Sequence, residues 1–178
     1  MNNVIDKGRF IAFVGPIGCG KTLAAVACIK NYKENNPEVK ILSTLKMRYI
    51  RHGGFRLGEM LSYKDKLIFL DMVESYTSRR LTEGLEDNFV GSIDQLEENK
   101  NKLIITICNP DELLPSLQPY LDTIILTKYC RTTDRVLMSI RKKSLDRPVL
   151  EYISDASKYF KYYDTLDLPS KELQRIKK

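Results

Sequence analysis

The residues in this sequence with the clearest chemical potential form one short run near its start. The run has the pattern G-x-x-x-x-G-K-T and consists of Gly15, Pro16, Ile17, Gly18, Cys19, Gly20, Lys21 and Thr22. Glycines let such a loop turn its N–H groups toward phosphate oxygens, the lysine reaches the β- and γ-phosphates, and the threonine hydroxyl can bind Mg²⁺. We therefore expect residues 15–22 to bind the phosphates of a nucleoside triphosphate, with Thr22 as a magnesium ligand.

The segments on either side of this loop support the same interpretation. Residues 10–14 before it are a short apolar run, which is typical of a buried parallel strand. Residues 22–29 after it are rich in alanine and favour a helix. A strand, a glycine-rich loop and a helix thus follow in the order that phosphate binding requires, because the positive end of the helix then faces the anion.

A second group of candidate residues follows the apolar run at 67–70. Asp71 comes directly after this run, at the expected carboxyl end of a strand, where open α/β sheets bind their ligands. A carboxylate there can hold Mg²⁺, directly or through water. The next residue is Met72, which cannot take a proton, and Glu74 is the nearest carboxylate. Glu74 is either the base that polarises the attacking water or an exposed or capping residue.

Arginines and the end of a later strand supply the remaining candidates. Arg79 and Arg80 suit the charge of a phosphate transition state, because a guanidinium stays protonated and binds in a bidentate manner. An ordinary surface pair is the alternative, and the rivals for the catalytic role are Arg131, Arg135 and Arg141. Asn109 follows the apolar run at 102–108. It either contacts the γ-phosphate or forms a turn with Pro110.

Further apolar runs alternate with helix-forming segments along the chain. Strands are expected at 40–44, 66–71, 102–108, 122–127, 136–140 and 149–152, helices at 57–61, 81–96 and after Asp111, and a loop at 52–54. This order predicts an α/β fold with a mostly parallel central sheet and helices on both faces, and the last two strands fit an antiparallel edge. We expect one domain over residues 1–178, with a core at about 9–153 and a C-terminal tail at about 154–178.

Composition narrows the class of protein. The 178 residues are 43% hydrophobic and carry a formal net charge of +6. This charge suits a polyanion partner such as nucleic acid, but it is only weak evidence, because an ordinary basic surface explains it almost as well. The four cysteines form no C-x-x-C pair and there is one histidine, so we expect no zinc site and no disulfide framework, but a cytoplasmic protein with reduced thiols. No apolar run approaches the roughly 20 residues that span a bilayer, so no membrane partner is expected.

Taken together, these segments resemble the FtsK–HerA superfamily of P-loop ATPases, and within it the viral genome-packaging ATPases and the Zot-like phage assembly proteins. The resemblance rests on residues 15–22, 68–71 with 78–79, 104–106, 121–122 and 163–165. It implies a RecA-like core, a hexameric ring of identical subunits, hydrolysis of ATP with Mg²⁺ at the subunit interfaces, and double-stranded DNA threaded through the centre.

The resemblance also implies roles for individual residues. Lys21 and Thr22 match the phosphate and magnesium residues of the superfamily, and Asp71 matches its metal-linked acid. Arg79 or Arg80 matches the arginine that follows the second motif. The catalytic glutamate of the superfamily is replaced by Met72 in this sequence.

The leading hypothesis is an ATP-driven translocase of double-stranded DNA that packages a viral genome, in the cytoplasm of a host, with a capsid or portal protein as a further partner. One alternative is a small nucleotide or nucleoside kinase, with residues 131–135 as a basic lid. Another is a nucleotide-binding assembly protein with little turnover, which Met72 favours. An aromatic cluster is expected to pack on the core or on a neighbouring subunit, and it consists of Tyr159, Phe160, Tyr162 and Tyr163.

Overall fold

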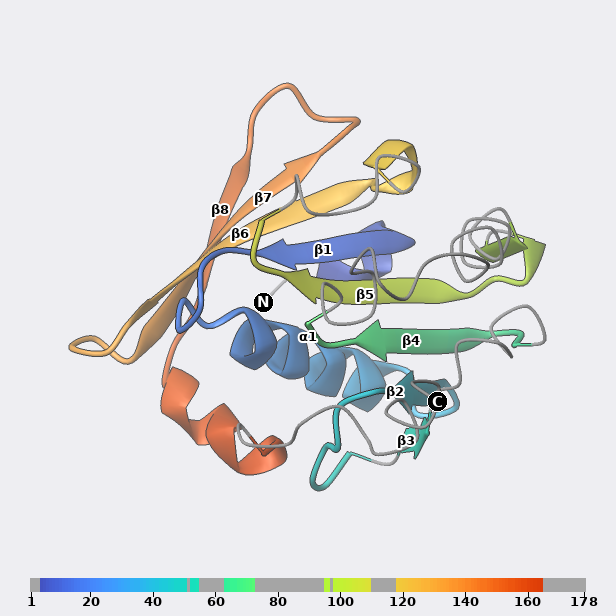
Figure 1. Ribbon diagram of the computed structural model, residues 1–178, viewed down its shortest axis with the longest axis horizontal. Coiled ribbons are helices and arrows are strands. Elements are labelled where there is room, and N and C mark those ends of the chain that lie inside the picture. The colour runs from blue at the N-terminus through green and yellow to red at the C-terminus, as the bar shows by residue number, and fades with distance from the viewer. Residues whose placement is uncertain are drawn as a thin grey trace, which may run out of the picture.

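The protein is built around one mixed β-sheet (Figure 1). The computed structural model describes residues 4–50, 52–54, 63–72, 95–96, 98–109 and 118–164. Within these residues the sheet has eight strands in the order β3-β2-β4-β5-β1-β6-β7-β8. The strands are β1 (Phe10–Val14), β2 (Lys40–Ser43), β3 (His52–Gly54), β4 (Lys66–Leu70), β5 (Lys102–Ile107), β6 (Thr123–Cys130), β7 (Arg135–Lys142) and β8 (Val149–Ile153). The first six strands in this order, which end with β6, pair in parallel. The pairs β6–β7 and β7–β8 are antiparallel. The predicted α/β fold with an antiparallel edge is confirmed.

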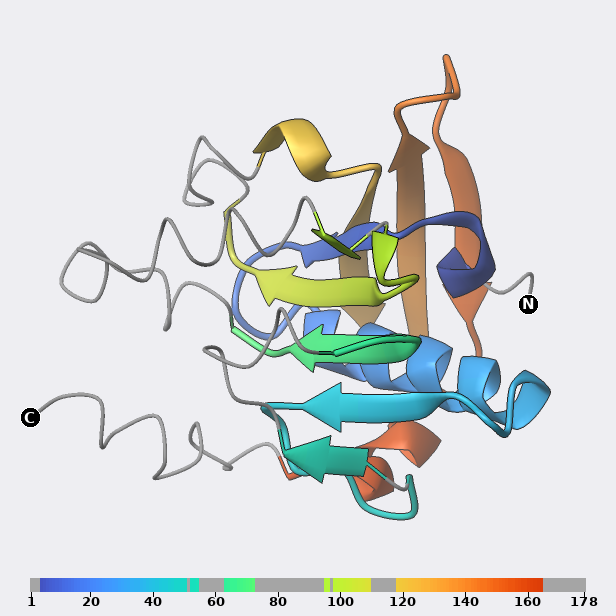
Figure 2. The same cartoon turned by 90° about the vertical axis from the view of Figure 1, so that its right-hand side faces the viewer.

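Four helices have bounds in the described residues, one α-helix and three short 3-10 helices, and residues 95, 96 and 98 are helical as well. The four are α1 (Lys21–Asn35), η1 (Val4–Lys7), η4 (Gln118–Tyr120) and η5 (Ala156–Tyr162). Figure 2 shows α1 running behind the parallel strands. None of the helices in the described part of the chain is long and apolar enough to cross a membrane.

The central strands are buried on both faces, and β1 shows how the sequence achieves this. Ile11 and Phe13 point to the face that α1 covers, whereas Phe10, Ala12 and Val14 point to the other face. Side chains of a strand alternate between faces, so a strand that packs on both sides is apolar at every position. The unbroken apolar run at 10–14 is explained by this double burial, since all five residues are buried.

Helix α1 packs closely on the sheet because small residues lie along its contact face. Ala24, Ala25 and Ala27 are fully buried, and their short side chains let the helix approach the strands. The helix also contacts η1 and η5, which explains why residues 23–29 are apolar and buried on every side of the helix. On the opposite face of the sheet, the helical residue Leu96 packs in the second apolar cluster together with Phe10 and Ile68.

The loop that the sequence predicts at residues 52–54 is a strand, so this prediction was wrong. Ile41, Leu42 and Ser43 of β2 pair in parallel with this segment, which forms β3 at the edge of the sheet. Gly53 suits the position because an added Cβ would lie 3.1 Å from a methyl carbon of Leu42. Glycine pairs signal turns in a sequence read alone, and the neighbouring strand overrides that signal here.

The other predicted elements agree with the structure or fall outside it. Strands β4 and β5 end one residue earlier than expected, at Leu70 and Ile107. The predicted helices at 57–61 and after Asp111, and most of the helix at 81–96, lie outside the described residues.

Replacement of Phe69 by alanine is expected to lower the free energy of unfolding by about 3–5 kcal/mol. Phe69 is fully buried on the α1 face of β4, so the substitution removes an aromatic ring and leaves a cavity. Denaturant unfolding followed by circular dichroism measures the change. Leu150→Ala serves as the control, because Leu150 is 66% exposed and its loss should cost less than about 0.5 kcal/mol. Equal losses in the two variants would contradict this assignment of the core.

Candidate functional site

The glycine-rich loop that joins β1 to α1 adopts a backbone that requires glycine. Gly15 and Gly20 have φ angles of 148° and 89°, a region that other residues rarely adopt. Space is restricted as well: a Cβ at Gly15 would lie 2.6 Å from Cys19 Sγ, and one at Gly20 would lie 3.1 Å from Cβ of Tyr129. The glycines of the sequence motif are therefore needed for both the turn and the close packing of the loop.

Hydrogen bonds tie this loop to the strands on either side of it. The Gly15 N–H donates to the carbonyl of Ile107 at the end of β5, at 3.3 Å. Cys19 Sγ lies 3.1 Å from Thr127 Oγ1 on β6. The loop is thus anchored between β5 and β6, with Cys19 turned back toward the sheet.

Lys21, the first residue of α1, lies inside the curve of the loop. Its Nζ donates to the carbonyl oxygens of Gly15 and Pro16, at 2.6 and 3.1 Å, and lies 3.5 Å from Cys108 Sγ. The side chain is almost fully buried, and the carbonyl dipoles satisfy its charge. The ammonium group is held where an anion bound by the loop N–H groups would meet it.

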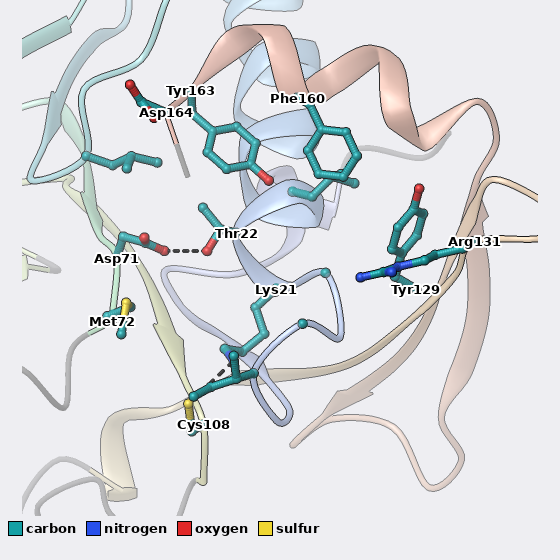
Figure 3. Close-up of a pocket in the computed structure, with 15 residues that line it drawn as sticks. Lys21, Thr22, Asp71, Met72, Cys108, Tyr129, Arg131, Phe160, Tyr163 and Asp164 are labelled. Carbon is teal, nitrogen blue, oxygen red and sulfur yellow. Dashed lines mark hydrogen bonds between the residues drawn. The ribbon is translucent and has the colours of Figure 1, made fainter. Parts of the chain in front are cut away.

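Thr22 and Asp71 form the second polar centre of the site (Figure 3). Oδ1 of Asp71 accepts hydrogen bonds from the Thr22 hydroxyl at 2.8 Å and from the Thr106 hydroxyl at 2.7 Å. The Asp71 N–H donates to Thr44 Oγ1 at 3.0 Å, and the Met72 N–H donates to Thr106 Oγ1 at 2.7 Å. Hydroxyl and carboxylate oxygens are the ligands that Mg²⁺ prefers, so Thr22 and Asp71 fit a magnesium ion.

These two centres open into a pocket of about 650 Å³, a volume typical of small-molecule sites. Its lining consists of Ile17, Gly18, Gly20, Lys21, Thr22, Leu23, Leu45, Asp71, Met72, Cys108, Tyr129, Arg131, Phe160, Tyr163 and Asp164. Figure 3 shows that Asp71, Met72 and Cys108 lie on one side of Lys21, and Tyr129, Arg131 and Phe160 on the other. The pocket therefore has a polar end beside Asp71 and an aromatic end beside β6 and η5.

The aromatic end was not predicted as part of the site. The rings of Tyr129 and Phe160 lie edge to face, with centroids 6.0 Å apart, and the centroids of Phe160 and Tyr163 are 6.4 Å apart. Tyr163 is buried and lies beside Thr22 in Figure 3. This burial, together with the charge of Asp71, raises the pKa of its hydroxyl. Sequence spacing carried no signal for this group, because β6 and η5 are brought together only by the fold.

Asp134, in the turn between β6 and β7, connects the two segments that carry these aromatic residues. Its carboxylate accepts hydrogen bonds from the Ser157 hydroxyl at 2.7 Å, the Ser157 N–H at 2.9 Å and the Tyr129 hydroxyl at 3.1 Å. The Ser157 bonds are the main cause that lowers the pKa of Asp134. Arg48 holds the other end of η5. Its backbone N–H donates to the carbonyl of Tyr162, and its guanidinium lies 3.4 Å from the carboxylate of Asp164.

The structure brings some of the predicted site residues together and leaves others outside. Lys21, Thr22 and Asp71 converge at the carboxyl edge of the sheet, as the two motifs predict. Asn109 is exposed two residues beyond β5, and its neighbour Cys108 lines the pocket. Glu74, Arg79 and Arg80 lie outside the described residues. The roles given to all of these residues stay predictions.

A glycine-rich loop between β1 and α1, with an aspartate at the end of β4, which is separated from β1 by β5 alone, defines a P-loop nucleoside triphosphatase. Residues 11–129, more than half of the chain, match the family model for the ATPase family associated with various cellular activities, AAA. The chain belongs to this family of P-loop ATPases. A comparison with curated proteins gave no match.

Several solved structures have the same fold. The N-terminal domain of zonular occludens toxin from Neisseria meningitidis is 12% identical, with a TM-score of 0.62 over 88% of this chain and 99% of that one. The genome packaging NTPase B204 from Sulfolobus turreted icosahedral virus 2, in complex with AMPPCP, is 10% identical, with a TM-score of 0.57 over 85% of this chain and 98% of that one.

A third structure is EssC (ATPases 2 and 3) from Geobacillus thermodenitrificans, which is 13% identical, with a TM-score of 0.57 over 97% of this chain and 44% of that one. The predicted resemblance to Zot-like and genome-packaging ATPases is thereby confirmed. At these identities, the likeness establishes the fold.

Cys130, next to Arg131 at the rim of the site, is expected to react with iodoacetamide with a half-maximal rate near pH 7. Hydrogen bonds from Thr132 and then Thr133 lower the pKa of this exposed thiol to about 7, and the thiolate is the reactive form. The rate should rise with pH through that value and level off above it. Burial, with a smaller effect of Glu151, raises the pKa of Cys28 to about 12, so that thiol should stay unlabelled.

Mass spectrometry of the labelled peptides resolves the individual cysteines, and Cys130→Ser gives the background. Thr132→Val removes the hydrogen bond that lowers the pKa of Cys130 most. The pH at which labelling reaches half its maximal rate should then rise toward the ordinary thiol pKa of about 8.5. A midpoint near 8.5 in the unmodified protein would show that these hydrogen bonds are not made.

Proposed function

We propose that this protein is an ATP-driven translocase that packages a viral genome of double-stranded DNA into a capsid. The observation that carries the proposal is the convergence of Lys21, Thr22 and Asp71 on one pocket. It occurs in a chain with the fold of B204, itself a genome packaging NTPase. The net charge of +6 supports a polyanion as the partner. The active form is a hexameric ring in the cytoplasm of a host, with ATP hydrolysed at subunit interfaces and a capsid or portal protein as a further partner.

The residues of the loop would hold ATP through its phosphates. Backbone N–H groups toward the end of the loop and the N-terminal end of α1 would face the anion, and Lys21 would exchange its carbonyl partners for phosphate oxygens. Thr22 and Asp71 would hold Mg²⁺, which, when bound, neutralises phosphate charge. Thr106 keeps the Asp71 carboxylate in place through its 2.7 Å hydrogen bond.

The remaining catalytic roles belong to residues proposed from the sequence. Glu74 polarises the attacking water in place of the glutamate that Met72 replaces, and Asn109 senses the γ-phosphate. Arg79 or Arg80 stabilises the charge of the transition state, and a ring would allow a neighbouring subunit to supply it. A base, a metal-linked acid and an arginine together account for hydrolysis at a subunit interface.

The kinase alternative loses its main support. It relies on residues 131–135 as a movable lid, but residues 131–134 form the short turn between β6 and β7. Asp134 ties this turn to η5 through Ser157. A turn fixed in this way is poorly suited to opening and closing over a second substrate.

The assembly-protein alternative keeps its support from Met72. This residue has a φ of 52° and lines the pocket beside Asp71, where its thioether cannot accept a proton. If no other base acts, the protein would bind ATP with little turnover.

Lys21→Ala is expected to lower ATPase activity by about 100-fold or more, because the variant loses the cation nearest the phosphates. Lys30→Ala is the matched control: Lys30 lies on the same helix and pairs with Glu34 on its surface. Steady-state phosphate release with and without double-stranded DNA measures both variants. DNA should stimulate the unmodified protein and Lys30→Ala.

Three results would contradict the proposal. Full turnover by Lys21→Ala would exclude the mechanism, and phosphate transfer to a nucleoside monophosphate would favour a kinase. Tight ATP binding without turnover, whether or not DNA is present, would favour an assembly protein.

Glu74→Gln is expected to lower kcat by about 100-fold while leaving ATP affinity unchanged, because the amide cannot accept a proton from water. Met72→Glu in the same protein should restore part of the activity, since the side chain at position 72 lines the pocket. Stopped-flow nucleotide binding and steady-state turnover separate the two effects. Glu98→Gln, at an exposed position, is the control. Unchanged turnover in Glu74→Gln would exclude Glu74 as the base.

A further inference from the structure

We infer that Phe160, on helix η5, is the stacking platform for the base of the bound nucleotide. This inference rests on the proposed binding of a nucleoside triphosphate and assigns the part of the pocket that the phosphate-binding motif does not explain. The ligand class is a nucleotide whose flat base covers the ring of Phe160. The segment beyond β8 would then be part of the nucleotide site.

The direction in which a nucleotide would lie follows from the two ends of the pocket. Lys21, Thr22 and Asp71 gather at the polar end, which suits the terminal phosphates and a metal ion. Figure 3 shows Phe160 and Arg131 on the opposite side of Lys21 from Asp71. A triphosphate held along the loop with its terminal phosphate beside Asp71 therefore directs its sugar and base toward Phe160.

The aromatic end has the chemistry that a base requires. Phe160 is 41% exposed although it lines a pocket, so part of its ring is open to a ligand. Exposed aromatic surface is favourably covered by another flat ring, because stacking combines burial of apolar area with attraction between π systems. Stacking involves the face of a base and not the polar groups on its edge. The contact is therefore expected to bind adenine and guanine nucleotides equally.

Neighbouring groups hold Phe160 in one orientation. Tyr129 meets its ring edge to face at 6.0 Å and 81°, and the Tyr129 hydroxyl is fixed by Asp134 at 3.1 Å. The same Asp134 carboxylate binds Ser157, three residues before Phe160. Asp134 thus connects Tyr129, which supports the ring of Phe160, to the backbone of η5. Because Phe160 is already held in place, binding of a base costs little conformational entropy.

The test compares a ligand that carries a base with one that lacks it. The magnesium complexes of AMPPNP, GMPPNP and inorganic tripolyphosphate are titrated calorimetrically into the full chain. Phe160→Ala is expected to weaken both nucleotides by about tenfold or more, and to leave tripolyphosphate within about twofold. Phe160→Tyr keeps the ring and should bind all three ligands like the unmodified protein.

Tyr152→Ala provides the matched control. Tyr152 is a 59% exposed aromatic residue whose ring lies 5.3 Å from the guanidinium of Arg135, on strands β8 and β7 and outside the lining of the pocket. Its loss should change none of the three affinities. If Phe160→Ala does not fold, Phe160→Leu keeps the apolar volume without the ring, and the same selective loss is expected.

Each remaining outcome overturns the inference. Equal weakening of nucleotides and tripolyphosphate would mean that Phe160 only supports the loop, and no weakening would mean that the base lies elsewhere. In both cases the unmodified protein still binds nucleotide, so the proposed function survives. Failure of the unmodified protein to bind any of the three ligands would instead remove the proposed function, and this inference with it.

Discussion

The carboxylate of Asp71 is the point on which the geometry of the site depends. One of its oxygens accepts hydrogen bonds from Thr22 on α1 and Thr106 on β5, and its backbone N–H donates to Thr44, just after β2. Hydrogen bonds to an ionised acceptor are stronger than neutral ones, so this residue joins the helix to three neighbouring strands at their carboxyl ends. A shift of α1 against the sheet would break these bonds. The end of the phosphate loop is therefore positioned by side chains as well as by its own backbone.

Lys21 shows how the loop keeps a positive charge available. Its hydrogen bonds run to the carbonyls of Gly15 and Pro16 and to the thiol of Cys108, that is, to dipoles instead of a carboxylate. Carbonyl dipoles compensate the cost of burying the ammonium without cancelling its net charge. Together with the N-terminal end of α1, the loop thus presents an uncancelled positive potential to the pocket.

The sequence allowed prediction of the features that local rules determine. The phosphate loop, the strand that ends at Asp71 and the antiparallel edge follow from glycine spacing, apolar runs and their order along the chain. His52–Gly54 was predicted wrongly because β3 exists only through its pairing with β2. The aromatic end escaped prediction for the same reason: Tyr129, Phe160 and Tyr163 come together through the packing of η5 against α1, and no spacing in the sequence encodes that contact.

The antiparallel edge explains why the C-terminal segment reaches the pocket at all. β6 is parallel to β1, so it ends at the edge of the sheet where the phosphate loop begins. β7 leads the chain away from that edge, and β8, antiparallel to β7, leads it back. Asp155, with a φ of 49°, then turns the chain into η5. A single added strand would have left the chain at the far edge. The two added strands β7 and β8 therefore place η5 with Phe160, and Tyr163 directly after it, at the same edge of the sheet as Lys21 and Asp71.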